Sequence, residues 1–189
     1  MRTTKVILCF LAFASIVAGC NFGRPAASAS QIALDDKLTA ATKTNNAPEV
    51  RQLLKQGADP NDKSIDLGFS FALSIAIAKN ETEIFNMLIQ AGAWTTPTDL
   101  MQASNMGHIG MVAVLLKRHV PINGRDDQGN TAVMWACHHN RLAIVKLLVA
   151  NCADVTLKNN KGADAQSVAK SRGYVELARY LANVTSGQK

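Results

Sequence analysis

The side chains that could do chemistry stand together in the sequence Cys137-His138-His139. A cysteine–histidine pair can act as a nucleophile with its base, and paired histidines can bind a metal ion. Adjacent residues on a helix point about 100° apart, so the two imidazoles do not converge on one metal. A nucleophile pair also needs hydrogen-bond reach and a third, orienting group. We therefore expect contact or solvent roles for these residues, and no metal or other cofactor.

Two pairs of adjacent acids, Asp35-Asp36 and Asp126-Asp127, are the other candidates for acid–base chemistry. Aspartates are also favoured at helix starts and in turns, which are the elements expected at both places. The sequence has no glycine-rich phosphate loop and no nucleophile elbow. The prediction is a protein that is not an enzyme. An enzyme using Cys137, His138 and His139 is the weakest alternative.

The cluster lies in a segment, residues 130–155, whose pattern predicts a helix, a tight turn and a second helix. Thr131 is expected to cap the first helix with its side-chain oxygen, and Asn140 to form the turn. Apolar side chains between Leu142 and Val149 give the second helix a broad buried face. Two helices of about ten residues cannot close a core alone, so this pattern requires copies.

Copies appear when the chain is aligned on the turn residue. The intervals between successive turn residues are 35, 27, 33 and 33, at Asn45, Asn80, Gly107, Asn140 and Gly173. An alanine stands four positions before each one, at Ala41, Ala76, Ala103, Ala136 and Ala169. A leucine stands eight positions after each one, at Leu53, Leu88, Leu115, Leu148 and Leu181. The small alanine lets the two helices of a unit approach closely, and the leucine fills the space between units.

The repeat resembles the ankyrin-repeat family over residues 34–184. The family's motifs stand here as Thr131-Ala132-Val133-Met134 at the helix opening, Gly107-His108 at the turn and Gly57-Ala58-Asp59-Pro60-Asn61 at the close. No unit keeps the full opening motif, and the closing glycine is replaced by His119 and Cys152 in two units. The resemblance implies an all-α solenoid of about five helix-turn-helix units with short finger turns, and a surface that binds another protein.

The third unit departs from the period. Trp94-Thr95-Thr96-Pro97 replaces its finger, so one finger should be missing and Trp94 should be exposed beside a notch. The fourth and fifth fingers, residues 123–130 and 158–162, are polar and rich in turn residues, and Asp164 is placed to cap a helix. The first unit is expected to open at Asp35-Asp36, and the first and last units to act as caps.

Residues 1–19 are typical of a secretory signal. Arg2 and Lys5 precede an apolar run, residues 6–18, that is too short for a stable membrane span. Val17-Ala18-Gly19-Cys20 resembles the bacterial lipobox, which implies lipidation of Cys20 after cleavage. An ordinary signal cleaved nearby is the alternative. The resemblance implies an exported, periplasm-facing protein anchored to the membrane by its lipid, and Asn21 implies the outer membrane if the cell is Gram-negative.

The remaining predicted domains are a lipidated flexible tether at 20–33, the ankyrin-repeat domain at 34–184 and a tail at 185–189. Removal of residues 1–19 lowers the formal net charge from +6 to +4, because that segment holds two basic residues and no acid. The other basic residues are scattered and lack interleaved aromatic side chains, which argues against a nucleic-acid partner.

Cys137 and Cys152 are the thiols left to the exported domain after loss of Cys9 and lipidation of Cys20. An oxidising compartment favours a disulfide. The two cysteines are nevertheless expected at opposite ends of antiparallel helices, on the order of 10 Å apart, whereas a disulfide needs Cα atoms within roughly 7 Å. We expect two buried thiols, with pairing as the alternative.

The predicted partner-binding residues share an exposed position on a finger or in the groove. They are Trp94, Arg125, Asp127, Gln128, Asn130, His138, His139, Asn160, Lys161 and Arg172. Ordinary solvent exposure is the alternative for each of them.

Small ankyrin-repeat lipoproteins of the envelope resemble immunity proteins that bind and neutralise a secreted antibacterial effector, such as a phospholipase or lipase. This resemblance implies a protein partner, the product of a neighbouring gene, and a chain that is monomeric when unbound. The alternative is a periplasmic ankyrin scaffold or a stress-protection partner of another envelope enzyme. A neighbouring toxin gene would favour the first role, and a neighbouring oxidative-stress enzyme the second.

Overall fold

The computed structural model describes residues 28–61 and 71–187. The predicted signal peptide, Cys20, most of the predicted tether and residues 62–70 lie outside the described residues, as do the last two residues of the chain.

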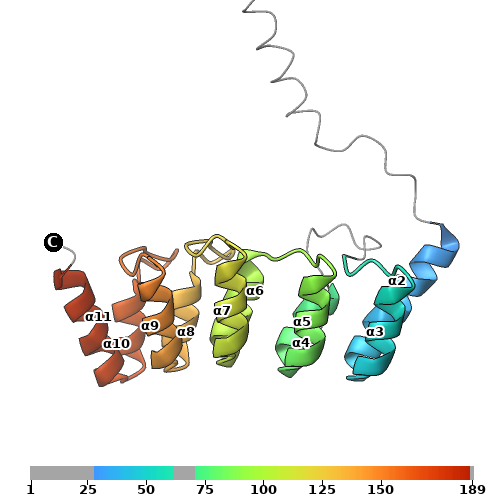
Figure 1. Ribbon diagram of the computed structural model, residues 1–189. Coiled ribbons are helices and arrows are strands. Elements are labelled where there is room, and N and C mark those ends of the chain that lie inside the picture. Colours follow the sequence, from blue (N-terminus) through green and yellow to red (C-terminus); the bar gives the residue numbers. More distant parts are fainter. Residues whose placement is uncertain (1–27, 62–70, 188–189) are drawn as a thin grey trace, which may run out of the picture.

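The described part of the chain contains ten helices and no strand. In chain order the helices are α2 (Ala29–Lys43), α3 (Ala47–Lys55), α4 (Phe71–Lys79), α5 (Thr82–Gln90), α6 (Pro97–Met106), α7 (Ile109–Lys117), α8 (Ala132–His138), α9 (Leu142–Ala150), α10 (Ala165–Ser171) and α11 (Val175–Gly187). Successive helices form antiparallel pairs that stand side by side in one row (Figure 1). The predicted all-α solenoid of five helix-turn-helix units is confirmed.

The tight turn inside each pair is closed by a residue with a left-handed backbone. All five predicted turn residues have positive φ, between 54° at Asn45 and 92° at Gly107. The next N–H donates to the carbonyl oxygen of the repeated alanine, as from Asn46 to Ala41 and from Arg141 to Ala136, both at 2.9 Å. This bond is the Schellman closure of a helix C-terminus, which glycine and asparagine accommodate best.

The second helix of each of the first four units ends in the same way. Its left-handed residue is Gly57, Gly92, His119 or Cys152, with φ of 93°, 88°, 57° and 66°. The following N–H donates to the repeated leucine, as from Ala153 to Leu148 at 3.0 Å. The leucine therefore recurs at a fixed backbone position of the helix end, and His119 and Cys152 replace glycine without changing the turn.

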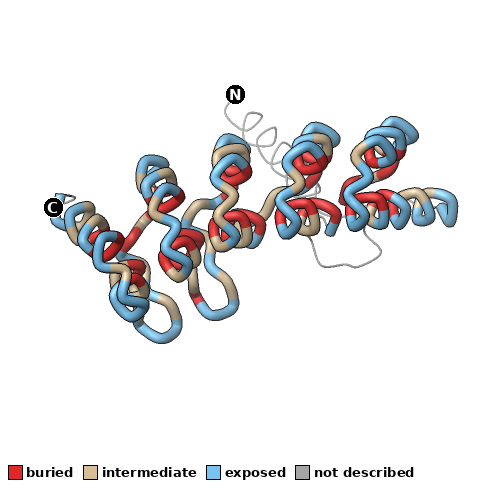
Figure 2. Tube along the Cα trace, turned by 90° about the horizontal axis from the view of Figure 1, so that it is seen from below, coloured by how far each residue is buried: buried red, intermediate tan, exposed pale blue. Residues whose placement is uncertain are grey.

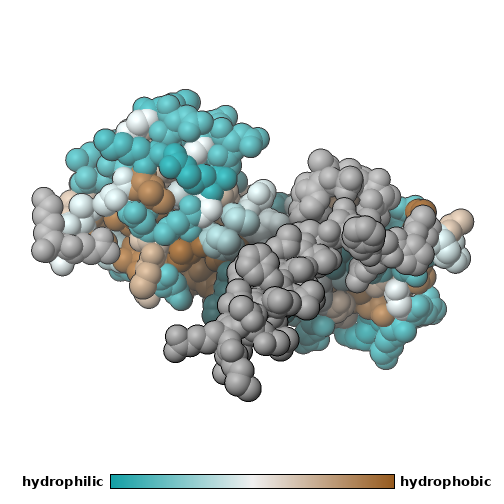
Figure 3. Space-filling model, turned by 90° about the horizontal axis from the view of Figure 1, so that it is seen from above, coloured by the Kyte–Doolittle hydropathy of each residue, from teal (hydrophilic) through white to brown (hydrophobic). Residues whose placement is uncertain are grey.

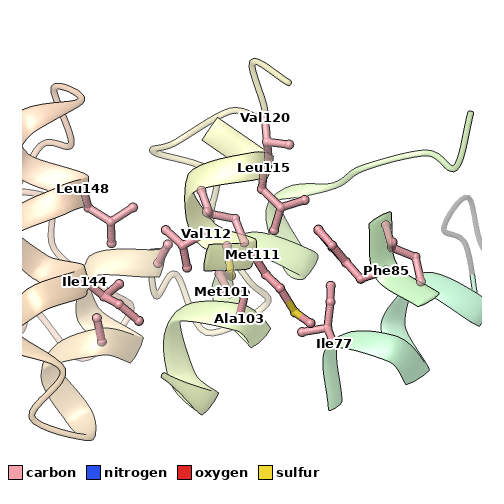
Figure 4. Close-up of a cluster of buried hydrophobic side chains, with 14 of the residues drawn as sticks. Ile77, Phe85, Met101, Ala103, Met111, Val112, Leu115, Val120, Ile144 and Leu148 are labelled. Atoms are coloured by element: carbon pink, nitrogen blue, oxygen red, sulfur yellow. The ribbon is translucent and has the colours of Figure 1, made fainter. Parts of the chain in front are cut away.

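The alanine and leucine columns form the core of the row. In the four C-terminal units every column residue is 0% exposed, and in the first unit Ala41 and Leu53 are 3% and 6% exposed. The buried residues line the faces that the helices turn to one another (Figure 2). Figure 4 shows Phe85, Val112 and Leu148, which come from three successive units, filling the spaces between helix pairs. Burial of this apolar surface stabilises the stack by about 25 cal/mol per Å².

The start of the first unit differs from the prediction. Helix α2 begins at Ala29, inside the predicted tether, and Ser28 caps it by accepting a hydrogen bond from the Gln31 N–H at 3.2 Å. Asp35 therefore lies within the helix, where it is 6% exposed and does not act as a cap. Its carboxylate instead accepts bonds from the Asp59 N–H at 2.7 Å and from Gln31 Nε2 at 2.8 Å.

The predicted cap at Thr131 is also wrong. Thr131 is the residue before α8, but its side chain makes no cap bond, and its Oγ1 is buried without a hydrogen-bond partner. The residue is 1% exposed, because its side chain is turned into the packed interior and away from the helix amides.

The connections between units have unequal lengths. Residues 118–131 and 151–164 form two long connections that include the predicted fingers, and the names fourth and fifth finger denote these whole connections. Only residues 91–96 join α5 to α6. The predicted shortening of the third connection is confirmed. Both fingers project from the same side of the row (Figure 2). As predicted, Asp164 caps α10, accepting from the Ser167 N–H at 2.7 Å.

Candidate functional site

The fourth and fifth fingers are bonded to each other along their length. The links run from Asp154 N to Asn123 Oδ1 (2.9 Å), Arg125 Nη2 to the Lys158 carbonyl, Asn159 Nδ2 to Asn130 Oδ1 (2.8 Å), Asn160 N to the Gln128 carbonyl (2.9 Å) and Asn160 Nδ2 to the Asp127 carbonyl (3.0 Å). The two fingers approach so closely that a Cβ on Gly129 would lie 2.6 Å from Asn160 Oδ1. Together they form one hydrophilic surface (Figure 3).

Asp126 organises the fourth finger from inside. Its carboxylate accepts hydrogen bonds from Gln128 N, Asn130 N, Asn130 Nδ2 and Trp135 Nε1, at 3.0, 2.7, 3.2 and 2.9 Å. Burial of the group favours its neutral form, but the bonds to Asn130, Trp135 and Gln128 outweigh burial and lower the pKa of Asp126. Asp126 is thus a structural carboxylate that ties the finger to Trp135 of α8.

A row of rings continues from Trp135 to the end of α8. The Trp135 and His138 ring centroids are 5.8 Å apart, and those of His138 and His139 are 4.7 Å apart. Arg172, at the end of α10, contacts the His138 ring through its guanidinium. Burial lowers the pKa of His138, and the charges of Arg172 and His139 lower it further. At neutral pH the row therefore presents a neutral imidazole between an indole and an exposed cation.

The backbone of Trp94, in the connection before α6, is held by Asn61 of the connection after α3. The Trp94 N–H donates to Asn61 Oδ1 at 2.7 Å, while Asn61 Nδ2 donates to the Gly92 carbonyl at 3.0 Å. The Trp94 side chain is 46% exposed, which confirms its predicted exposure. Two residues later Thr96 caps α6 in a capping box with Asp99, whose carboxylate accepts from the Thr96 N–H at 2.7 Å.

The predicted partner-binding residues fall into separate groups. Arg125, Asp127, Gln128, Asn130 and Asn160 all take part, by side chain or main chain, in the bonds that join the two fingers. His138, His139 and Arg172 lie together at the other end of the helices. Lys161 is exposed at the fifth finger, and its N–H is bonded to Asn159 Oδ1 at 3.0 Å.

Trp94 lies apart from both groups. The fourth finger does reach the third unit, since a Cβ on Gly124 would lie 2.3 Å from Pro97 Cβ. Its tip residues, however, bond to the fifth finger. Sequence reasoning missed Trp135 as a surface residue, because its apolar neighbours on α8 are buried and nothing in the spacing separates it from them.

No group of three His, Cys, Asp or Glu side chains within residues 28–61 and 71–187 could hold a metal ion. Burial raises the pKa of the Cys137 thiol to about 12, so the nucleophilic thiolate is not populated at neutral pH. Among the described helices, none has the length and apolar character needed to cross a membrane.

The two cysteines of the repeat domain are free thiols in different surroundings. Cys137 is buried, as predicted, but Cys152 is exposed, so the prediction of two buried thiols is wrong for Cys152. The reason is its backbone position, because the left-handed residue after a second helix lies in a surface turn.

Comparison with known proteins agrees with this architecture. The family model for ankyrin repeats in three copies matches residues 73–159 and 100–189. The chain is 31% identical over 157 residues to ankyrin repeat and SAM domain-containing protein 6 of Rattus norvegicus, covering 80% of this chain and 16% of that protein.

Two further relatives are more distant. Ankyrin repeat domain-containing protein SAT10 of Stachybotrys chartarum is 27% identical over 148 residues, which are 78% of this chain and 8% of that protein. Neurogenic locus notch homolog protein 1 of Xenopus laevis is 28% identical over 131 residues, which are 66% of this chain and 5% of that protein.

The chain thus spans under a fifth of the length of each of these relatives. Its repeats form a protein–protein interaction module, of a kind whose relatives are typically non-catalytic. With its Schellman turn inside every helix pair, its paired fingers and these matches, the chain belongs to the ankyrin-repeat family.

Proposed function

We propose that this chain is an immunity protein of the bacterial envelope, which binds and neutralises a secreted antibacterial effector such as a phospholipase or lipase. The observation that carries the proposal is the pair of ordered surfaces at the two ends of the helices, the bonded fingers at one end and the exposed C-terminal ends of α8 and α10 at the other. Because these groups are already ordered, a partner docking on them does not have to pay the entropy of fixing loops.

The lipobox-like sequence supports the tethered form of the proposal. Cys20 precedes the first residue of α2 by nine positions, so a lipid on Cys20 would hold the module close to a membrane. Cys20→Ser should release the protein from membranes without unfolding it. Cell fractionation with a labelled fatty acid measures both properties, and a wild type that takes up no label would contradict the tether.

Trp94 is the proposed aromatic anchor of the partner. It stands where Asp59 and Asp154 stand after the first and fourth units, two positions after the left-handed residue that ends the second helix. Its N–H is fixed by Asn61, so the half-exposed indole is presented on an ordered backbone. Few residues carry most of the energy of an interface, and tryptophan is prominent among them.

Trp94→Ala should therefore weaken partner binding by at least about 2 kcal/mol, or roughly thirtyfold. Lys161→Ala, at the fifth finger, should cost less than about 1 kcal/mol. The measurement is isothermal titration calorimetry against the product of the neighbouring gene, with a thermal melt of each variant. Unchanged binding, or a melting temperature lowered by several degrees, would show that Trp94 is not the anchor.

A further inference from the structure

We propose that the turn edge of the fourth and fifth units docks an acidic segment of the partner protein, which Arg141 and Arg172 bind together with His138 and His139. The turn edge is the side of the solenoid formed by the tight turns inside the helix pairs, residues 44–46, 79–81, 106–108, 139–141 and 172–174. The proposal rests on the proposed function, because it names the chemistry of the partner that the module binds.

Basic side chains along this edge reach the turn region of the preceding unit. The guanidinium of Arg141 lies 2.9 Å from the place where a Cβ of Gly107 would be. Arg172 contacts the ring of His138, and Lys79 Nζ donates to the Lys43 carbonyl at 2.6 Å. In three of the units one cation therefore reaches from its own turn to the previous turn, and the charges are arranged as a row.

Carboxylates of the described residues form no ion pair with these cations. Within the described residues the one ion pair closer than 4.0 Å is Arg51–Glu83, which joins α3 to α5. Arg172 meets an imidazole, and the charges of Arg172 and His139 add to burial in lowering the pKa of His138. The guanidinium of Arg172 thus contacts a neutral ring and that of Arg141 lies over a glycine, so both positive charges are left for a carboxylate from outside to bind.

The elements packed against α8 supply no acid at this edge, and Glu176, which α11 brings to it in its first turn after Arg172, makes no ion pair closer than 4.0 Å with a described residue. Helix α10 brings Lys170 and Arg172, α9 is preceded by Arg141, and the turn after α6 brings His108. The one acid of α6, Asp99, lies in its first turn at the opposite end. The whole C-terminal part, residues 97–189, has eleven basic and six acidic residues, whereas residues 28–96 have six basic and eight acidic. Charge complementarity therefore selects an acidic partner segment.

The spacing of the row indicates how that segment is built. Neighbouring helices pack 8–10 Å apart, so cations on successive units are separated by about 10 Å. Three residues of extended chain span about the same distance. In the polyproline II form of extended chain, which repeats every three residues and rises about 3.1 Å per residue, Asp or Glu at every third position would lie on one face and place one carboxylate at each cation. Each guanidinium can bind its carboxylate through two parallel hydrogen bonds.

A protein segment fits the edge better than a lipid surface does. Helix α2 starts at the finger end, because Gln31 Nε2 donates to the carbonyl of Gly57 in the connection after α3. The second helices α3, α5, α7 and α9 are each nine residues long, which at 1.5 Å per residue separates the two ends by about 14 Å. That distance exceeds the Debye length of about 8 Å at physiological salt, so a membrane on the tether side would meet the fingers first.

The test uses the full chain in a neutral detergent and two fluorescent peptides, one with Glu at every third position among Gly and Ser and one with Gln in its place. We expect the Glu peptide to bind, and Arg141→Gln with Arg172→Gln to weaken its binding at least about tenfold. The matched control is Arg118→Gln, an exposed arginine at the finger end, which should change the affinity less than about twofold.

Equal binding of the Gln peptide would overturn the proposal, as would an equal loss in Arg118→Gln, since net charge alone would then explain binding. Phosphatidylcholine vesicles with and without phosphatidylglycerol are the second probe. Vesicles that bind through Arg141 and Arg172 when the Glu peptide does not bind would identify a lipid site and also overturn it.

The same variants separate this inference from the proposed function. If the neighbouring gene product binds the wild type and the double variant equally well, the acidic-segment proposal fails while the immunity role stands. If that protein does not bind the wild type at all, the proposed function fails, whatever the peptide does. Thermal melts of each variant identify any loss of binding that is caused by unfolding.

Discussion

Asp126→Ala should loosen the fourth finger and destabilise the unit that carries it. The aspartate accepts four hydrogen bonds, from Gln128 N, from the N–H and the side-chain amide of Asn130, and from the indole of Trp135. Alanine leaves all four donors without this acceptor. The loss should spread to the fifth finger, because Asn130 also bonds to Asn159.

The magnitude follows from where the donors lie. A hydrogen bond to a charged group contributes about 1.5–3 kcal/mol when it is shielded from water, and about 0.5–1.5 kcal/mol is typical of others. The amides of Gln128 and Asn130 lie on a finger and can turn to solvent, whereas Trp135, in α8, is half-buried. We therefore expect a loss of about 2–3 kcal/mol, which is well below the sum of four separate bonds.

The assay is urea unfolding followed by circular dichroism, with Asp127→Ala as the matched control. Asp127 is the next residue and is exposed, and only its main-chain carbonyl is bonded, to Asn160 Nδ2. Its replacement should change the free energy of unfolding by less than about 0.5 kcal/mol. If the two variants are equally stable, the assignment of Asp126 as the organising carboxylate is refuted.

The pH dependence provides a second check with a definite sign. The pKa of Asp126 is lowered in the folded protein, because its hydrogen bonds outweigh the effect of burial. Its stabilising contribution is complete above the unfolded-state value of about 3.9 and disappears as pH falls through the folded pKa. The stability difference between the wild type and Asp126→Ala should therefore shrink in acid, and a difference that grows there would contradict the hydrogen-bond account.

Two other predictions concern the core and the third unit. Leu148→Ala should lower the free energy of unfolding by about 2–5 kcal/mol, since the residue is 0% exposed. Ala136→Leu should also destabilise the protein, because the larger side chain overpacks the contact between the two helices. Urea unfolding within about 0.5 kcal/mol of the wild type would contradict the packing of the two columns. Burial raises the pKa of Asp99, although its hydrogen bonds to Thr96 oppose this. The wild type should therefore gain stability relative to Asp99→Asn as pH falls from about 7 to about 4. A stability difference that does not depend on pH would contradict the assignment of Asp99 as a buried carboxylate.

The repeat could be predicted from the sequence because its signals are local. Asn45, Asn80 and Asn140 and the two turn glycines are residues that tolerate a left-handed backbone, and all five adopt it. The alanine and leucine columns lie at fixed distances from those turns, so their burial follows from the same periodicity. The shortened connection at Trp94 was visible for the same reason, as a change in the interval between turns.

The contacts between units could not be predicted in this way. Asp126 and Asp127 are chemically identical neighbours, yet one is the acceptor of four bonds and the other is exposed. Only the tertiary structure distinguishes them, because the Trp135 indole that bonds to Asp126 comes from the next helix. Thr131 illustrates the opposite case, since a threonine at a helix start predicted a cap bond but the packing of the unit turned its side chain inward.

The two ends of the helix pairs use their polar side chains differently, and this difference bears on where a partner binds. At the finger end, Asn123, Asn130 and Asn160 are occupied with one another's finger, so a partner there meets groups whose hydrogen bonds are already made. At the turn edge, Arg141 and Arg172 have no carboxylate of the described chain within ion-pair distance. An incoming acid gains more where it meets guanidinium groups without a carboxylate partner than where it must compete with existing bonds. On this reasoning the fingers supply shape and the turn edge supplies the charge that selects the partner.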